Sequence, residues 1–169
     1  QFNAWANRLA WAFKADGVDH GAVVAVLVEN RLELLAVLAA LTKLGAIGAL
    51  LNTTQRGKVL SHSLNLVKPR FFVIGEELVD AFNEIRHQVP GAEHPCYWLA
   101  DRDTLQDSGH TPDDWVNLSL RQASQSEQNL PDSLRVKMKD PCFYIYTSGT
   151  TGLPKASIMS HGKWIKAYG

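Results

Sequence analysis

The chain has 169 residues, of which 46% are hydrophobic and 20% are charged, as is typical of a soluble globular domain with a sizeable core. The 17 Lys and Arg residues balance the 17 Asp and Glu residues, so the formal net charge is zero. This balance argues against a nucleic-acid-binding surface, which normally carries a basic excess, but it is compatible with a local anion site.

The first hundred residues alternate between helical and strand patterns. Trp5, Leu9 and Phe13 recur at helical spacing and predict a first helix that stops at Asp16-Gly17. Apolar runs then predict strands at 22–30, 46–52, 70–75 and 96–100, and apolar stripes predict helices at 31–45, 55–67 and 78–85. This alternation indicates an α/β fold, with a mostly parallel sheet flanked by helices and right-handed crossovers.

Leu34–Leu51 is the most apolar segment and approaches the length of a membrane span. Lys43, Gly45 and Gly48 interrupt it, and its pattern changes from helical to strand-like at the glycines. We therefore predict a buried helix, a turn and a buried strand. Asn30 is predicted to cap this helix at its start, and Gly45 to end it.

Cys96 and Cys142 lie far apart, with no His or Cys at ligand spacing. They predict two buried thiols in a reducing cytosol, and neither a zinc site nor a disulfide framework. No signal peptide is visible. The sequence begins with Gln1 and both of its ends fall in predicted helices, so we interpret it as a piece of a longer protein.

Residues 101–140 are polar and rich in turn formers, with a short helix predicted at 115–120. We predict three regions: an α/β sheet subdomain at 1–100, a polar excursion or boundary at 101–140, and a strand–loop–strand unit at 141–169. In the last region, residues 142–146 and 156–160 have strand patterns, and a helix is predicted near 161.

The loop between these last two strands, within "YIYTSGTTGLPKAS", has the composition of an anion-binding loop. Its glycines can adopt positive φ and expose backbone N–H groups, its hydroxyls can donate hydrogen bonds, and its lysine adds a positive charge stiffened by a preceding proline. The candidate phosphate-binding residues are Thr147, Ser148, Gly149, Thr150, Thr151, Gly152 and Lys155.

Two common nucleotide-binding motifs are absent from the sequence. The spacing G-x-x-x-x-G-K-[ST] is not met, because Pro154 occupies the position that the second glycine would need after Gly149. No G-x-G-x-x-G occurs anywhere in the chain. The loop also lies between strands, so no helix dipole supports it. The simpler alternative is a Ser/Thr/Gly hairpin loop that binds nothing.

The ordered string "YTSGTTGLPKA" (Tyr146–Ala156) resembles the signature loop of the adenylate-forming superfamily, which includes acyl-CoA synthetases, luciferases and the adenylation domains of peptide synthetases. The upstream "VAVLVENRLELLAVLAALTKLGAIGALLNTTQRGKVLSHSLN" is similar to the N-terminal region of long- and very-long-chain acyl-CoA synthetases, notably the fatty-acid-transport-protein group. The resemblance covers most of the chain and is weakest across 101–140. It implies part of the large N-terminal domain of such an enzyme.

The resemblance also implies a two-step reaction. A fatty carboxylate attacks the α-phosphate of ATP to give acyl-adenylate and pyrophosphate, and the thiol of coenzyme A then displaces AMP. The loop residues named above would hold the β- and γ-phosphates, and Lys155 would act catalytically by neutralising the departing pyrophosphate. Mg²⁺ is expected for the same reason, with no protein cluster of metal ligands.

The family's adenine pocket, ribose clamp and lid lysine lie downstream of this loop, so the isolated chain is expected to be inactive. The substrates imply a cytoplasmic protein, with peripheral association at the inner face of a membrane as a further expectation. Two alternatives stay open: an enzyme that adenylates an aryl, short-chain or amino acid, and a fatty-acid transport or scaffold protein without turnover. Acyl chain length and oligomeric state are not predicted.

Other residues of chemical interest have simpler explanations. His62 is predicted to pack or cap within its helix, and Trp164 to lie in the core rather than stack on adenine. His161 is predicted either to begin a helix or to orient the loop. Glu76-Glu77 reads as a solvated helix start, where acidic side chains suit the positive end of the helix dipole.

Overall fold

The computed structural model describes residues 1–94, 96–101, 111–131, 136–147 and 152–168. Within them, seven strands form one sheet. From one edge to the other, its strands are β5 (Val116–Asn117), β4 (Tyr97–Leu99), β3 (Phe71–Gly75), β1 (Val23–Leu27), β2 (Ile47–Leu50), β6 (Pro141–Thr147) and β7 (Lys155–Ser160). All neighbours are parallel except β6 and β7, which form an antiparallel hairpin. The predicted fold class is confirmed.

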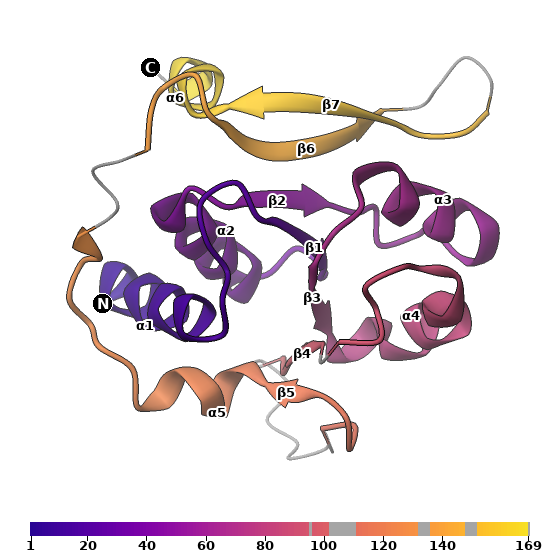
Figure 1. Ribbon diagram of the computed structural model, residues 1–169, viewed down its shortest axis with the longest axis horizontal. Coiled ribbons are helices and arrows are strands. Elements are labelled where there is room, and N and C mark those ends of the chain that lie inside the picture. Colours follow the sequence, from indigo (N-terminus) through magenta and orange to yellow (C-terminus); the bar gives the residue numbers. More distant parts are fainter. Residues whose placement is uncertain (95, 102–110, 132–135, 148–151, 169) are drawn as a thin grey trace.

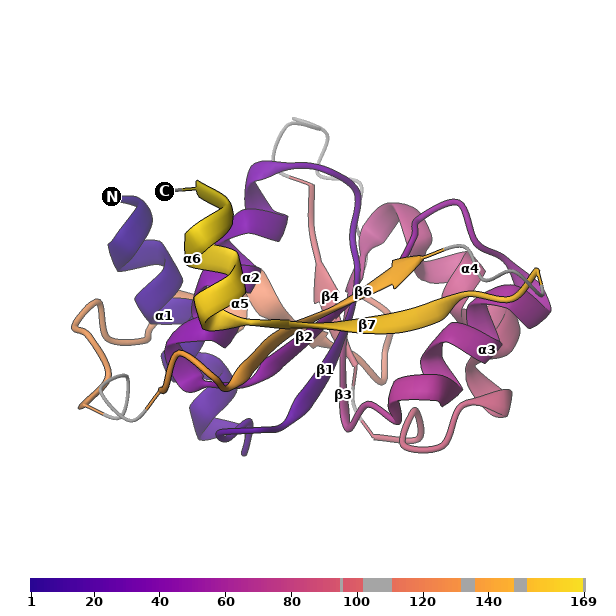
Figure 2. The same cartoon turned by 90° about the horizontal axis from the view of Figure 1, so that it is seen from above.

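Helices cover both faces of the sheet (Figure 1). The helical segments are α1 (Phe2–Ala15), α2 (Leu32–Leu44), α3 (Gly57–Val67), η1 (Glu76–Leu78), α4 (Val79–Ile85), η2 (Arg86–Gln88), α5 (Leu118–Ala123) and α6 (His161–Tyr168). The helices α1, α2 and α5 lie on one side, and α3 and α4 lie on the other (Figures 1 and 2).

Each face of the sheet has its own hydrophobic core, because strand side chains alternate between the two faces. In β1, Val24 and Val26 pack into the core beneath α1 and α2, which includes Phe13. Ala25 in the same strand packs into the core beneath α3 and α4, which includes Phe82. A strand buried on both faces reads as a continuous apolar run, which is why the sequence predicted it.

The apolar segment 34–51 forms most of α2, a turn and β2, as predicted. Gly45 ends the helix with φ 70°, and its own N–H donates to Thr42 O at 3.2 Å. The predicted cap at Asn30 is wrong, because Arg31 occupies the N-cap position and makes no side-chain capping bond. Within the described part of the chain, no helix has both the length and the apolarity needed to cross a membrane.

The region 101–140 contributes structure to the sheet edge. Val116 pairs with Tyr97 in parallel register, and the Trp115 ring meets the Phe82 ring edge-on at 5.8 Å. The helix predicted at 115–120 instead begins at Leu118, capped by the side chain of Asn117. Residues preceding it form β5, whose two residues are too short to give a strand pattern in the sequence.

Both cysteines are buried free thiols, as predicted. Burial raises the pKa of Cys96 to about 11, and it also raises the pKa of Cys142. A thiol with a raised pKa stays protonated at neutral pH and is a poor nucleophile. The two cysteines therefore act as small apolar core residues.

Candidate nucleotide-binding site

The β6–β7 hairpin carries the predicted phosphate-binding loop. Phe143 in β6 pairs with Gly48 in β2, so the parallel sheet fixes the direction in which β6 delivers the loop. At the end of the hairpin, Thr147 and Lys155 stand directly opposite each other in the antiparallel register. Both are exposed, and because directly opposed residues share a face, their side chains project to the same side of the hairpin.

The structure describes three of the seven predicted phosphate-binding residues: Thr147, Gly152 and Lys155. Ser148–Thr151 lie outside the described residues. Gly152 has φ +84°, in the left-handed region that its prediction required. Among described residues, no heavy atom beyond its chain neighbours lies within 4 Å of the place that a Cβ would take. The assignment of all seven to phosphate binding stays a prediction.

Helix α3 contacts both arms of the hairpin next to the loop. The Tyr146 hydroxyl, at the end of β6, donates to Ser63 O at 2.7 Å. On the other arm, His62 Nε2 lies 3.2 Å from Pro154 O. His62 was predicted to have a packing or capping role rather than a catalytic one, and its contact to the loop was not foreseen. Its partner lies 92 residues away, beyond the reach of local sequence patterns.

The loop lies at the carboxyl edge of the parallel strands, where α/β sheets bind their ligands. The connection after β2 approaches this edge with Asn52, whose side-chain oxygen accepts hydrogen bonds from the backbone N–H and the hydroxyl of Thr54 at 2.9 and 2.8 Å. The connections after β1, β3 and β4 reach the same edge. Described residues from five strands therefore converge there.

Arg31 ties three of these connections together. Its side chain is 8% exposed and donates to Leu99 O, Ala100 O and Glu77 Oε2 at 3.0, 2.6 and 3.1 Å. Glu77 also accepts from the backbone N–H of Glu29 at 2.9 Å. The prediction of a solvated helix start at Glu76-Glu77 missed this ion pair, because its partner comes from a different strand end.

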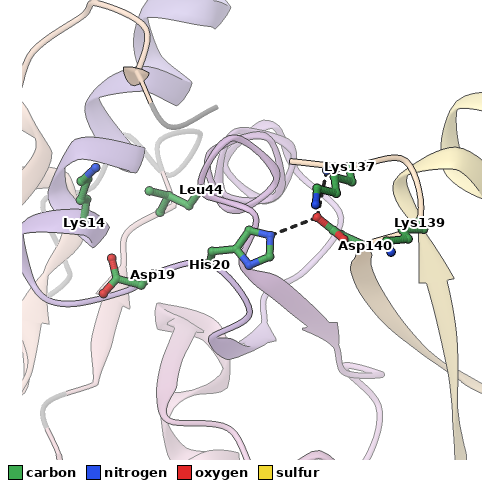
Figure 3. A pocket seen from close by; sticks show the side chains of 7 residues that line it. All are labelled: Lys14, Asp19, His20, Leu44, Lys137, Lys139 and Asp140. Carbon is green, nitrogen blue, oxygen red and sulfur yellow. Dashed lines mark hydrogen bonds and ion pairs between the residues drawn. The ribbon is translucent and has the colours of Figure 1, made fainter. Parts of the chain in front are cut away.

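The opposite, amino edge of the sheet holds a separate pocket of about 500 Å³ (Figure 3). Its lining residues are Lys14, Asp19, His20, Leu44, Lys137, Lys139 and Asp140. His20 Nε2 and Asp140 Oδ2 form a hydrogen bond of 3.1 Å across the pocket (Figure 3). The backbone N–H of Lys137 also donates to this carboxylate at 2.9 Å, and these hydrogen bonds lower the pKa of Asp140.

His161 and Trp164 lie at this far end of the hairpin, on α6 (Figure 1). Six strand residues, about 20 Å, separate His161 from the loop, so of the two roles predicted for it the structure favours the start of a helix. Burial lowers the pKa of His161. The Trp164 ring meets the Phe143 ring edge-on at 5.2 Å, but Trp164 is only half-buried and lies at the margin of the core that was predicted for it.

The family model described as "AMP-binding enzyme" matches residues 1–169, the whole chain. The chain belongs to the AMP-binding enzyme family. It is 35% identical over 165 residues to the medium/long-chain-fatty-acid–CoA ligase FadD6 of Mycobacterium tuberculosis, covering 98% of this chain and 25% of FadD6. It is 34% identical over 163 residues to long-chain fatty acid transport protein 6 of Mus musculus, covering 95% and 25%.

Among solved structures, this chain is similar to the anthranilate CoA ligase AuaEII in complex with anthranoyl-AMP. The TM-score is 0.81 at 25% identity, over 95% of this chain and 29% of AuaEII. The chain thus spans about a quarter of the length of the relatives that it matches. The resemblance stated from the loop string is confirmed at the level of the family, and the matching region of the relatives is N-terminal.

Proposed function

We propose that the complete protein is an ATP-dependent long-chain fatty acid–CoA ligase, and that this chain supplies the loop that binds the β- and γ-phosphates of ATP. The observation that carries the proposal is the position of the loop sequence Tyr146–Ala156. It joins two antiparallel strands at the carboxyl edge of a parallel sheet, in a member of the AMP-binding enzyme family. The likeness to a fatty-acid–CoA ligase over nearly the whole chain supports the choice of acid.

Charge stabilisation is the chemical task of this loop in the proposed reaction. Attack of the carboxylate on the α-phosphate forms acyl-adenylate and leaves pyrophosphate, so negative charge builds up on the leaving group. Thr147 and the amides and hydroxyls of 148–152 would donate hydrogen bonds to the phosphate oxygens. Lys155, opposite Thr147 in the hairpin, would place its ammonium beside the same oxygens.

The donor set of the loop also fits Mg²⁺ in the manner expected for nucleotide enzymes. Mg²⁺ keeps several waters and binds mainly through substrate phosphates, with few protein ligands. Among the described residues, no cluster of three His, Cys, Asp or Glu side chains could hold a metal. The loop hydroxyls would then hold Mg²⁺ through its waters, and the ion would neutralise phosphate charge. Coenzyme A is the proposed acceptor in the second step.

The proposed substrates place the protein in the cytoplasm, with peripheral association at the inner face of a membrane that supplies the fatty acid. The name of the relative from Mus musculus refers to long-chain fatty acid transport, which supports a role at a lipid source. The test is co-sedimentation of the complete protein with lipid vesicles. The protein should sediment with the vesicles, and added salt should release it.

The proposed ligase activity is tested by trapping acyl-adenylate. The complete protein, given ATP, Mg²⁺ and a long-chain fatty acid, should yield the acyl hydroxamate with hydroxylamine and release pyrophosphate. Lys155→Ala should slow this step, whereas Lys163→Ala, which removes an exposed lysine from α6 at the far end of the hairpin, should not. If the complete protein turns over only aryl, short-chain or amino acids, the proposed fatty acid substrate is wrong. If it turns over no acid, the proposed ligase function is rejected.

A further inference from the structure

We infer that His62 and Tyr146 are positioning residues for the phosphate-binding loop, holding its two ends against helix α3. This inference rests on the proposed function of the loop and extends it to residues outside the loop string. Tyr146 binds the helix at Ser63 O, one residue before the loop segment 147–152 begins. His62 binds Pro154 O, two residues after that segment ends.

The two contacts come from consecutive residues of α3. Ser63 supplies a backbone carbonyl and His62 supplies its ring, so one turn of the helix fixes the separation of the two arms. Ser63 is itself held, because its hydroxyl lies 2.8 Å from the side-chain oxygen of Gln55 and its residue is fully buried. The helix is therefore a rigid support, since Leu60 and Leu64 anchor it in the core.

The chemistry of each contact defines which group must donate. A backbone carbonyl only accepts hydrogen bonds, so the proton in the His62 contact lies on Nε2. In the second contact, burial raises the pKa of Tyr146, which keeps its hydroxyl protonated and able to donate to Ser63 O. Both contacts thus place a side-chain donor on a main-chain oxygen, at distances of 3.2 and 2.7 Å.

A groove continues the contact between α3 and the hairpin. It has a volume of about 540 Å³, and its lining includes Leu66 and Val67 of α3 and Tyr144, Ala156 and Ile158 of the hairpin. The pairing of β6 with β2 fixes the hairpin in the sheet as far as Ile145. The His62 and Tyr146 hydrogen bonds add two fixed points beyond those paired residues, at the end where the loop belongs.

Fixing the loop ends matters because a Gly-rich loop has many accessible conformations, and ordering them opposes binding. Donors that are already aimed at the phosphates cost no reorganisation during the reaction. His62 and Tyr146 touch neither the phosphates nor Lys155 in this account. They act through the backbone of the loop. Their loss should therefore lower the adenylation rate while changing the free energy of unfolding little.

The test compares three variants of the complete protein with two matched controls. His62→Ala removes one contact, and His62→Gln keeps a donor nitrogen at a similar reach. Asn65→Ala is the control on the same helix: it deletes a side-chain bond of 3.1 Å to Gln88 O, on the side of α3 away from the hairpin. Tyr146→Phe removes the second contact, and Tyr144→Phe removes a hydroxyl from the same face of β6.

Two measurements are made on each variant. The first is the hydrogen exchange of peptides covering 144–156 without any ligand, where His62→Ala and Tyr146→Phe should exchange about tenfold faster at 152–155, as expected for one lost hydrogen bond. The second is the kcat for hydroxamate formation, which should fall about tenfold with little change in the KM for the acid. His62→Gln should restore most of both, and Asn65→Ala and Tyr144→Phe should resemble the parent protein.

The inference is overturned if His62→Ala leaves loop exchange unchanged, or if His62→Gln is as defective as His62→Ala. The inference is also overturned if Asn65→Ala lowers the unfolding temperature and the loop protection as much as His62→Ala does, because the effect would then be general to α3. Hydrogen exchange needs no turnover, so it decides the positioning role even where the parent protein forms no hydroxamate. Failure of the parent protein to form any hydroxamate would instead reject the proposed ligase function.

Discussion

Gly152 shows at the scale of one residue how the loop depends on backbone conformation. Its φ of +84° lies in a region that costs an ordinary L-residue about 1–2 kcal/mol, and a β-branched residue more. Because described residues leave the Cβ position open, a larger side chain would be penalised by the backbone rather than by crowding within the protein. The bound phosphates would add a second constraint.

We predict that Gly152→Val slows adenylation by about thirtyfold or more, corresponding to roughly 2 kcal/mol of lost loop geometry. Gly152→Asn should retain most activity, because Asn tolerates the left-handed region better than other residues. Hydroxamate formation by the complete protein measures both, with unfolding temperature as the control. Near-normal rates in the valine variant would mean that the loop does not close on ATP, and equal losses in both variants would indicate crowding by the phosphates.

At the scale of elements, the sequence predicted the central strands and helices because their signals are local. Two-sided burial makes β1 a continuous apolar run, and Gly45 marks the end of α2. The errors have a common physical cause, namely partners that are distant in sequence. The N-cap of α2 is Arg31 and not Asn30, and the Arg31 side chain donates to Ala100 O after β4. The two residues of β5 form a strand only because β4 pairs with them.

The candidate site divides in the same way. The loop string could be recognised from the sequence because its residues are consecutive, and the antiparallel pairing of Thr147 with Lys155 follows from the two strands around it. The support from α3 could not, since His62 and Ser63 meet the hairpin across 92 and 83 residues of chain. Such contacts depend on the crossover that brings α3 beside β6.

Arg31 provides a test of how the strand ends are held together. We predict that Arg31→Met lowers the stability of the complete protein by about 3 kcal/mol, because it removes a guanidinium that is 8% exposed and takes the donor away from Glu77, Leu99 O and Ala100 O. Arg31→Lys should recover little, since a lysine cannot reproduce the fork that reaches Leu99 O, Ala100 O and Glu77.

Thermal unfolding measures this loss. Arg56→Met is the matched control, because the Arg56 side chain is exposed and bonds only to the neighbouring carbonyls of Thr53 and Gln55 among the described contacts. A drop in unfolding temperature of the same size in both variants would contradict the special role of Arg31.

At the scale of the whole molecule, the two edges of the sheet have different tasks. The carboxyl edge gathers the proposed phosphate-binding loop and the connections after β1 to β4, as ligand-binding α/β sheets commonly do. The amino edge joins distant parts of the chain: His20 precedes β1, whereas its partner Asp140 precedes β6, 120 residues later. This contact lies beside the start of the hairpin, and β6 then runs along the sheet to the opposite edge.

The pKa of Asp140 makes this junction sensitive to acid. The backbone N–H of Lys137 and the side chain of His20 stabilise the carboxylate, so its pKa in the folded protein lies below its ordinary value of 3.8.

A group with a depressed folded pKa contributes stability that is present above the ordinary value and is lost as the pH falls through the folded value. We therefore predict that Asp140→Asn lowers the unfolding temperature of the complete protein at pH 6, and that the gap to the parent protein narrows as the pH falls below 3.8. Asp19→Asn, which alters another carboxylate lining the same pocket, should leave the pH dependence as it is. A gap that stays constant as the pH is lowered from 6 to well below 3.8 would show that Asp140 acts through the shape of its side chain and not through its charge.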